Sequence, residues 1–254
     1  MDARLIAFER LLNIMDDLRE KCPWDKKQTI DSLRYLTIEE VYELSDAIIN
    51  NDMEEIKKEL GDIMLHLVFY TKIASEKKAF DVTDVLNGIC EKLIHRHPHI
   101  YGDLDVSSEE EVKANWEKLK LKEGKKSVLE GVPNSLPAMV KAIRIQEKAR
   151  GVGFDWDDKA QVWEKVEEEL NELKVEVENG NEQSTEEEFG DLLFSIINFS
   201  RFVSVNPEDA LEKTNKKFIK RFQYMEAQMA KNGLDISKLS LSEMYRYWNE
   251  AKSI

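Results

Sequence analysis

Apolar residues recur at intervals of three and four along most of the chain, with polar residues between them. The first segment shows this spacing at Leu5, Phe8, Leu11, Leu12, Met15 and Leu18. It is the period of an α-helix that buries one face, whereas the alternation expected of a half-buried strand is rare. The pattern therefore predicts an all-α fold, with helices at about residues 2–20, 29–50, 52–78, 82–96, 108–121, 137–150, 157–179, 184–204, 207–231 and 241–251.

One stretch, residues 118–139, interrupts this helical period. It contains Gly124, Gly131, Pro133 and Pro137, and these residues favour turns and loops over helix. We interpret it as the connection between two domains. The predicted boundaries are 1–120 for the first domain, 121–136 for the linker and 137–254 for the second domain.

The two predicted domains repeat the same acidic residues at a constant offset of 129 positions (168 − 39 = 129). The matching pairs are Glu39 and Glu168, Glu40 and Glu169, Glu43 and Glu172, Glu59 and Glu188, Gly61 and Gly190, and Asp62 and Asp191. Further along, the pairs are Lys92 and Lys217, Arg96 and Arg221, and Trp116 and Trp248. These matches indicate a tandem duplication of a helical bundle of about four helices.

The repeated acids have the spacing of a metal site. Residues three apart share a helix face, so Glu169 with Glu172 and Glu188 with Asp191 each project two carboxylates in one direction. A short loop between the helices favours antiparallel packing, which would bring the four together, and a bound cation would relieve their mutual repulsion. The same holds for Glu40, Glu43, Glu59 and Asp62.

The ligand chemistry favours Mg²⁺, or Mn²⁺ in its place, because all the donors are hard oxygens and the Glu-x-x-His of di-iron bundles is missing. The alternative is an ordinary solvated acidic face, which a single acid pair would suggest. Repetition of five acids in one frame favours the metal site. The basic pairs Lys217 with Arg221 and Lys92 with Arg96 are either exposed helix faces or phosphate contacts, and a metal beside a basic pair is typical of phosphate chemistry.

The composition argues against several classes of binding partner. A net charge of -14 argues against a surface that binds nucleic acid or anionic lipid. Two cysteines, Cys22 and Cys90, are too few for a disulfide framework. The most apolar stretches are about a dozen residues, short of the roughly 20 that span a membrane. We expect a soluble cytoplasmic protein.

Several other residues carry weaker signals. The spacing of His95, His97 and His99 does not suit a zinc site, so we favour a helix-end cap or a phosphate contact beside Arg96. Trp24 and Trp156, ahead of the acidic helices, are expected to anchor the core, with stacking on a nucleobase as the alternative. We expect His66 to be a hydrogen-bonded interior residue.

The motifs resemble those of the MazG nucleoside triphosphate pyrophosphohydrolases. The family pattern is E-E-x-x-E followed by E-x-x-D, and it fits both EEVYE with ELGD and EEELNE with EFGD. Further stretches resemble tandem-domain members of the family over nearly the whole chain, namely CPWDKKQT, HRHPHIYGD, SLPAMVKAIRIQEKARGVGFDW and YRYWNEAK. The resemblance implies two MazG-type all-α domains, a homodimer, and Mg²⁺-dependent hydrolysis of nucleoside triphosphates to monophosphate and pyrophosphate.

By the same resemblance, Glu169, Glu172, Glu188 and Asp191 would bind the metal, Lys217 and Arg221 the phosphates, and Trp248 would lie near the nucleotide. The corresponding first-domain set is Glu40, Glu43, Glu59, Asp62, Lys92, Arg96 and Trp116, although the second domain is the one associated with catalysis in tandem members. Glu168 and Glu39 are our candidates for helping the attacking water. A carboxylate-bridged redox bundle and a non-catalytic helical adaptor remain alternatives, and base preference does not follow from spacing.

Overall fold

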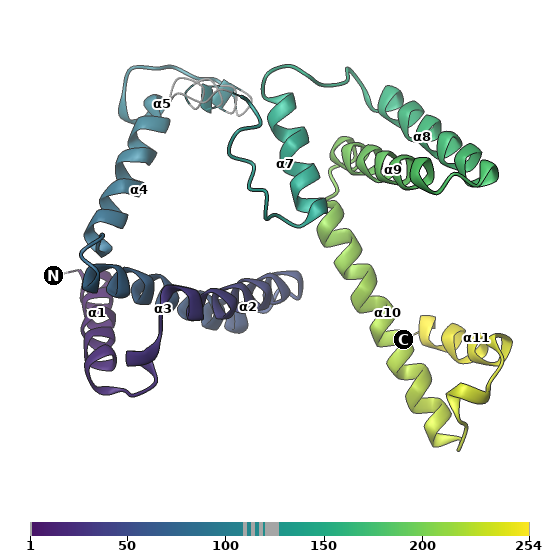
Figure 1. Cartoon of the computed structure of the whole chain (residues 1–254), viewed down its shortest axis with the longest axis horizontal. Coiled ribbons are helices and arrows are strands. Elements are labelled where there is room, and N and C mark those ends of the chain that lie inside the picture. The colour runs from purple at the N-terminus through teal and green to yellow at the C-terminus, as the bar shows by residue number, and fades with distance from the viewer. Residues whose placement is uncertain (1, 109–110, 113–114, 117–118, 120–126, 254) are drawn as a thin grey trace. The chain divides into compact units, whose positions relative to one another are not determined.

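The computed structural model describes residues 2–108, 111–112, 115–116, 119 and 127–253, and every element in these residues is helical. Its contacts divide the chain into two compact units, residues 1–107 and 108–254 (Figure 1). The all-α fold is confirmed. Most of the helix predicted at 108–121 and part of the predicted linker lie outside the described residues, so the boundaries 1–120 and 137–254 stay a prediction.

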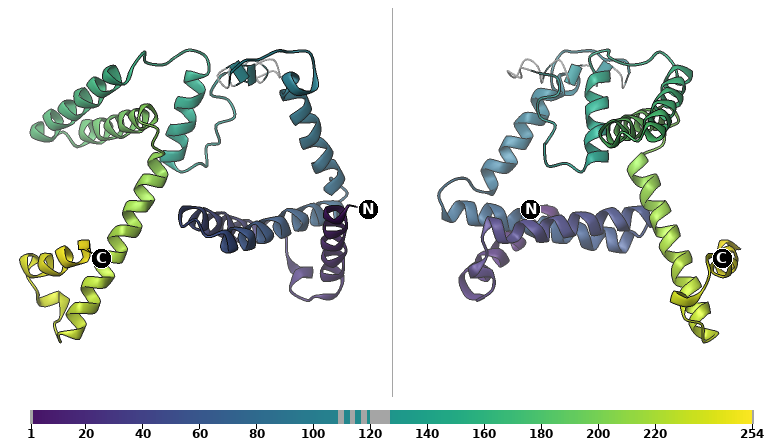
Figure 2. Two further views of the ribbon diagram at one scale, coloured as in Figure 1. Left: turned by 180° about the vertical axis from the view of Figure 1, so that it is seen from behind. Right: turned by 45° about the vertical axis from the view of Figure 1, so that its right-hand side comes forward.

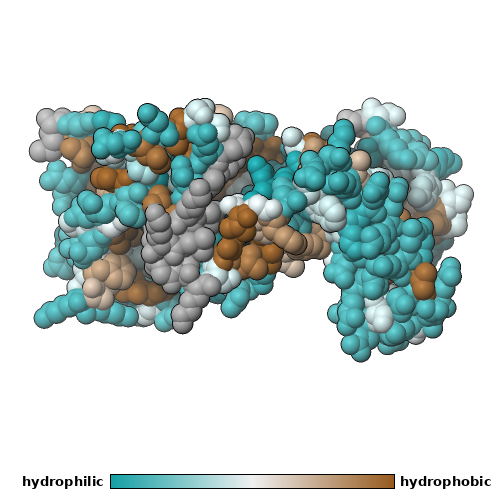
Figure 3. Space-filling model, turned by 90° about the horizontal axis from the view of Figure 1, so that it is seen from above, coloured by the Kyte–Doolittle hydropathy of each residue, from teal (hydrophilic) through white to brown (hydrophobic). Residues whose placement is uncertain are grey.

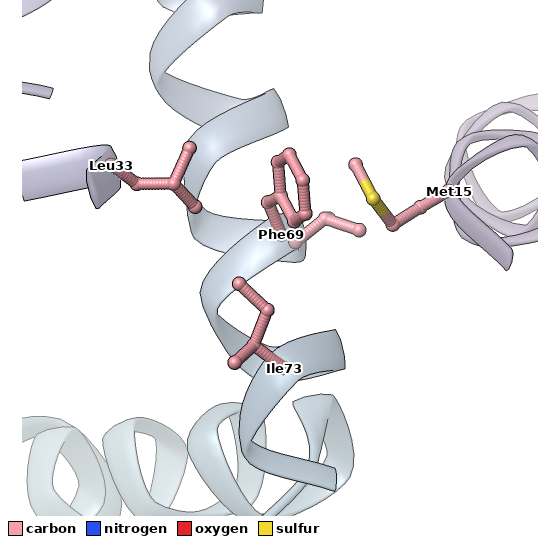
Figure 4. Packing of buried hydrophobic residues seen from close by; sticks show 5 residues of the cluster. Met15, Leu33, Phe69 and Ile73 are labelled. Atoms are coloured by element: carbon pink, nitrogen blue, oxygen red, sulfur yellow. The ribbon is translucent and has the colours of Figure 1, made fainter. Parts of the chain in front are cut away.

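The first unit is built on an antiparallel helix pair. Its helices are α1 (Ala3–Lys21), α2 (Ile30–Ile49), α3 (Met53–Glu76), α4 (Val82–Arg96) and the short α5 (Pro98–Tyr101), with a 3-10 turn η1 (Asp25–Lys27) between the first two. α2 packs along α3, and α1 contacts α3 near the C-terminal end of α3. Figure 4 shows the core at this contact, where Met15, Leu33, Phe69 and Ile73 point toward one another.

The turn between α2 and α3 is short and specified by its sequence. Asn51 adopts a positive φ of 54°, and the side chain of Asp52 accepts hydrogen bonds from the backbone of Glu54 and Glu55 at the start of α3. Such a cap satisfies the free amides of a helix N-terminus. α2 itself begins with a capping box between Thr29 and Ser32.

The second unit repeats this helix pair. Its helices are α7 (Ala138–Arg150), α8 (Lys159–Asn179), α9 (Glu182–Phe202), α10 (Pro207–Lys231) and α11 (Leu241–Glu250), with 3-10 turns η2 (Ile236–Lys238) and η3 (Ala251–Ser253). α8 packs along α9, α7 contacts α9, and α11 packs on the C-terminal half of α10. The turn between α8 and α9 has Gly180 at φ 70° and Asn181 as the cap, 129 positions after Asn51 and Asp52 (180 − 51 = 129).

Each unit is more open than the predicted four-helix bundle. α4 has no buried residue, and both α4 and α10 lead away from the helix pair of their own unit (Figures 1 and 2). Large apolar residues of the helix pairs, among them Leu60, Leu67 and Leu193, are exposed, and Figure 3 shows hydrophobic patches at the surface. Among the described residues, the helices are too short or too polar to span a bilayer.

Candidate functional site

Three carboxylates of the second unit form a group that could hold a metal ion. Glu169 and Glu172 project from α8 and Glu188 from α9, and one oxygen of each lies within 4.8 Å of the others. Glu169 lies on the buried face of α8 together with Val162 and Val166, because these residues follow one another at helical spacing. This spacing places the carboxylate of Glu169 at the edge of the core. Glu169 as a whole residue is only 6% exposed.

The electrostatics of this group are those of crowded like charges. Burial raises the pKa of the Glu188 carboxyl above its ordinary value, and the charges of Glu172, Glu169 and Asp191 raise it further. A divalent cation would remove this penalty, and a donor set of carboxylate oxygens suits Mg²⁺ or Mn²⁺. The residues present therefore fit such an ion.

Lys165 partly neutralises the group, and sequence analysis did not identify it. Its ammonium lies 2.7 Å from Oε1 of Glu169 and 2.8 Å from Oε1 of Glu168. These two acids raise the pKa of the lysine, Glu168 the more strongly. The i,i+3 and i,i+4 spacing from Lys165 was visible in the sequence, but such pairs are common on helices and rarely indicate a site.

The first unit holds the matching group, formed by Glu40, Glu43 and Glu59, again with one oxygen of each within 4.8 Å of the others. Here Glu59, from α3, is the buried member at 2% exposed, and among the described residues its Oε2 has no hydrogen-bond partner. Burial raises the pKa of Glu40, and Asp62 and Glu43 add to the effect. Glu59 Oε1 accepts a hydrogen bond of 2.9 Å from Lys58, which the sequence analysis also missed.

The remaining predicted acids lie at the margin of these groups. Asp62 and Asp191 are outside the sets of mutually close oxygens, although each acts on its neighbouring group by its charge. Glu168 and Glu39, the candidates for helping a water, are exposed on α8 and α2. Glu168 is tied to the group through Lys165.

The predicted phosphate contacts of the second unit come together, but away from the acids. The guanidinium carbon of Arg221 lies 6.0 Å from the centre of the Trp248 ring, and that ring also contacts Phe218 at 4.9 Å. Lys217, one turn before Arg221, is exposed. This part of α10 lies with α11, beyond the point where α10 leaves the α8–α9 pair (Figure 2).

The basic pair of the first unit also lies away from its acids. Lys92 and Arg96 lie in the last turns of α4, which starts at the end of α3 and runs away from the acids (Figure 1). Trp116 lies outside the first unit, because the boundary between the units is at residue 107. Within the described part of each unit, the basic pair is therefore not packed against the acidic group of that unit.

Three predictions for aromatic residues and histidines can be compared with the structure. The core-anchor interpretation of Trp24 and Trp156 is wrong, because these side chains are 56% and 45% exposed. His66 is buried, as expected, but its Nδ1 lacks a hydrogen-bond partner among the described residues, and burial lowers its pKa.

The helix-cap interpretation of His97 is confirmed. It is the C-cap of α4, and its Nδ1 lies 2.6 Å from the carbonyl oxygen of Leu93. The groups of described residues that could hold a metal contain none of His95, His97 and His99.

Comparison with known proteins yields a family and several relatives. The model of the MazG nucleotide pyrophosphohydrolase domain matches residues 28–101 and 158–225, which contain both helix pairs and both acidic groups. The chain is 48% identical over 97% of its length to a protein of Thermotoga maritima named nucleoside triphosphate pyrophosphohydrolase/pyrophosphatase MazG, of which it covers 96%.

Two further relatives extend this similarity. The chain is 39% identical over 96% of its length to a nucleoside triphosphate pyrophosphohydrolase of Escherichia coli, of which it covers 97%. It is 43% identical, again over 96% of its length, to the YabN protein of Bacillus subtilis, of which it covers 51%.

Proposed function

The chain belongs to the MazG family of nucleotide pyrophosphohydrolases, which are hydrolases acting on acid anhydrides, and we propose that it hydrolyses nucleoside triphosphates of the cytoplasm to the monophosphate and pyrophosphate. The observation that carries this proposal is the group of three close carboxylates, which occurs once in each unit at matching positions. The names of the relatives from Thermotoga maritima and Escherichia coli support the same reaction.

In the proposed site, Glu169, Glu172 and Glu188 hold Mg²⁺, with Asp191 completing the ligand set from the next turn of α9. When bound there, such an ion would polarise the phosphate chain and make a water molecule more acidic. Glu168, beside Glu169, is the proposed residue to orient the attacking water and accept its proton. The water oxygen bonds to phosphorus, the phosphoanhydride bond between the α- and β-phosphates breaks, and the monophosphate and pyrophosphate are released.

Lys217, Arg221 and Trp248 are the proposed contacts to phosphate and nucleotide. α10 carries these residues away from the acids of its own unit. We therefore propose that a second copy of the chain supplies the phosphate-binding residues that face these acids. The exposed apolar residues of the two helix pairs support a homodimer, since large exposed apolar side chains favour association; they include Leu60 and Leu67 in the first unit and Leu193 in the second.

The test is product analysis with a panel of ribo- and deoxyribonucleoside triphosphates. We expect monophosphate and pyrophosphate in the presence of Mg²⁺, and no turnover after EDTA treatment. A nucleoside diphosphate with inorganic phosphate as the products would contradict the proposal.

A pair of matched variants assigns the active unit. We expect Glu172→Ala to lower kcat by at least a hundredfold, because it removes one of the three ligands of the second unit, and Glu43→Ala to have a smaller effect. If Glu43→Ala abolishes turnover while Glu172→Ala leaves it intact, the assignment to the second unit is wrong.

A further inference from the structure

The second unit contains a largely apolar pocket of about 620 Å³, whose lining includes Trp156 but none of the predicted metal-binding, phosphate-binding or catalytic residues. It lies between α7, α9 and the loop that joins α7 to α8. The aromatic side chains of Phe154, Trp156 and Phe194 line it, together with the polar residues Gln146 and Asn198. Its volume is typical of pockets that bind small molecules.

The pocket continues the acidic group along α9. Asp191, Phe194, Asn198 and Arg201 follow one another at spacings of three, four and three residues, so they share one face of that helix. From Asp191 to Asn198 the helix rises about 10 Å. A ligand with phosphates at the acids and a ring system in the pocket would follow this face.

A second hollow lies beside the pocket, on the side of α8. It measures about 390 Å³, shares Asp155 and Trp156 with the pocket, and is also lined by Lys165 and Glu168. Lys165 contacts Glu169, a member of the acidic group. The pocket and the acidic group are therefore neighbours on both helices of the pair.

Hydrogen bonds hold the walls of the pocket in place. The guanidinium of Arg201 donates two hydrogen bonds to the carboxylate of Asp155, at 2.8 and 2.5 Å, which ties the loop to α9. Gln146 Nε2 donates to the carbonyl oxygen of Phe194 at 2.8 Å and ties α7 to α9. Gly153 has a φ of +87°, which an L-residue rarely adopts, so the loop conformation depends on glycine.

We propose that this pocket binds the base and sugar of the nucleotide, with the base stacked on Phe154 or Trp156. The inference rests on the proposed function and adds to it the residues that recognise the nucleoside. Aromatic rings stack on any base, whereas the amides of Gln146 and Asn198 offer both donors and acceptors that can distinguish base edges. The side chain of Phe154 is 81% exposed, so it is available to a ligand and can be replaced with little effect on folding.

The first experiment compares Phe154→Ala with Phe80→Ala, which removes an exposed phenylalanine in the other unit. We expect Phe154→Ala to raise KM for nucleoside triphosphates about tenfold at unchanged kcat, equivalent to about 1.4 kcal/mol of binding. Phe80→Ala should behave as the wild-type protein does. Equal KM values for both variants and the wild type would overturn the inference and leave the proposed function intact.

The second experiment does not depend on turnover. Unphosphorylated nucleosides are added to the protein in EDTA, and binding is followed by saturation-transfer NMR. We expect a signal with the wild type and Phe80→Ala, and its loss with Phe154→Ala. Nucleoside binding that depends on Phe154, without hydrolysis of any triphosphate, would support the pocket and refute the proposed function.

Two outcomes count against the pocket directly. Nucleosides that bind all three proteins equally, or none of them, would overturn the inference. A Phe154→Ala variant whose mass by light scattering differs from that of the wild type would overturn it as well, because the pocket would then be a contact between copies of the chain.

Discussion

Replacing Lys165 with methionine tests whether the acidic group of the second unit is a metal site. In the metal-free protein, Lys165 compensates the charge of Glu169, whose side chain is 8% exposed, while the lysine itself is 34% exposed. Breaking a fully buried ion pair costs about 3–5 kcal/mol, and an exposed pair is worth at most about 1 kcal/mol. This half-buried pair lies between these limits, so we expect Lys165→Met to lower the free energy of unfolding by about 2 kcal/mol.

Calorimetry in EDTA and in excess Mg²⁺ measures this effect. A loss of about 2 kcal/mol lowers the unfolding midpoint of a domain of this size by about 4–8 °C. Mg²⁺ should reduce the difference from the wild type to less than half, because the ion takes over the compensation of the carboxylates.

Lys174→Met is the matched control on the same helix, because Lys174 makes no ion pair among the described residues, and its midpoint should not change. If the Lys165→Met protein is destabilised equally with and without Mg²⁺, the lysine only packs on α8 and the reasoning about a cation is refuted.

Two other substitutions test local features of the two units. A Cβ at Gly190 would meet nothing within 4 Å, so Gly190→Ala should raise the free energy of unfolding in EDTA by about 0.5–1 kcal/mol. A lower unfolding midpoint in calorimetry would contradict this and show that another group packs against this face of α9. The hydrogen bond from Arg19 holds the pKa of Glu76 below its ordinary value. The contact therefore stabilises the folded protein at any pH above the ordinary pKa of glutamate, and this stabilisation is lost as the pH falls through the lowered pKa of Glu76. Because Glu76 is 38% exposed, Glu76→Gln should cost about 1 kcal/mol or less at neutral pH, and a difference from wild type in urea unfolding that persists at strongly acid pH would contradict this account.

The sequence was sufficient for the fold because the features that determine the helices are local. Helical periods and caps such as Thr29 and Asp52 lie within a few residues of one another, and the offset of 129 positions identified the duplication. The all-α fold and the family resemblance are confirmed. The short helix α5 was not predicted, because the predicted helix stopped at residue 96 and the four residues of α5 are too few to show a helical period.

The site was less predictable, because it depends on how helices pack. Spacing identified Glu169 and Glu188 as neighbours across a helix pair, but not which carboxylate is buried or that Lys165 compensates it. The position of Lys217 depends on the direction that α10 takes after residue 207, and no local pattern specifies that direction. The pocket was not predicted from the sequence for the same reason, since Phe154 and Phe194 belong to separate elements.

The two copies of the helix pair have balanced their charges by different substitutions. Lys58 on α3 accompanies Glu59, and Lys165 on α8 accompanies Glu169, while the matching positions carry Glu187 and Leu36. A hybrid pair of α2 with α9 would therefore contain neither lysine, and the reciprocal pair of α8 with α3 would contain both. The two helix pairs are therefore not interchangeable in charge, because one hybrid pair would lack a compensating lysine and the other would hold two.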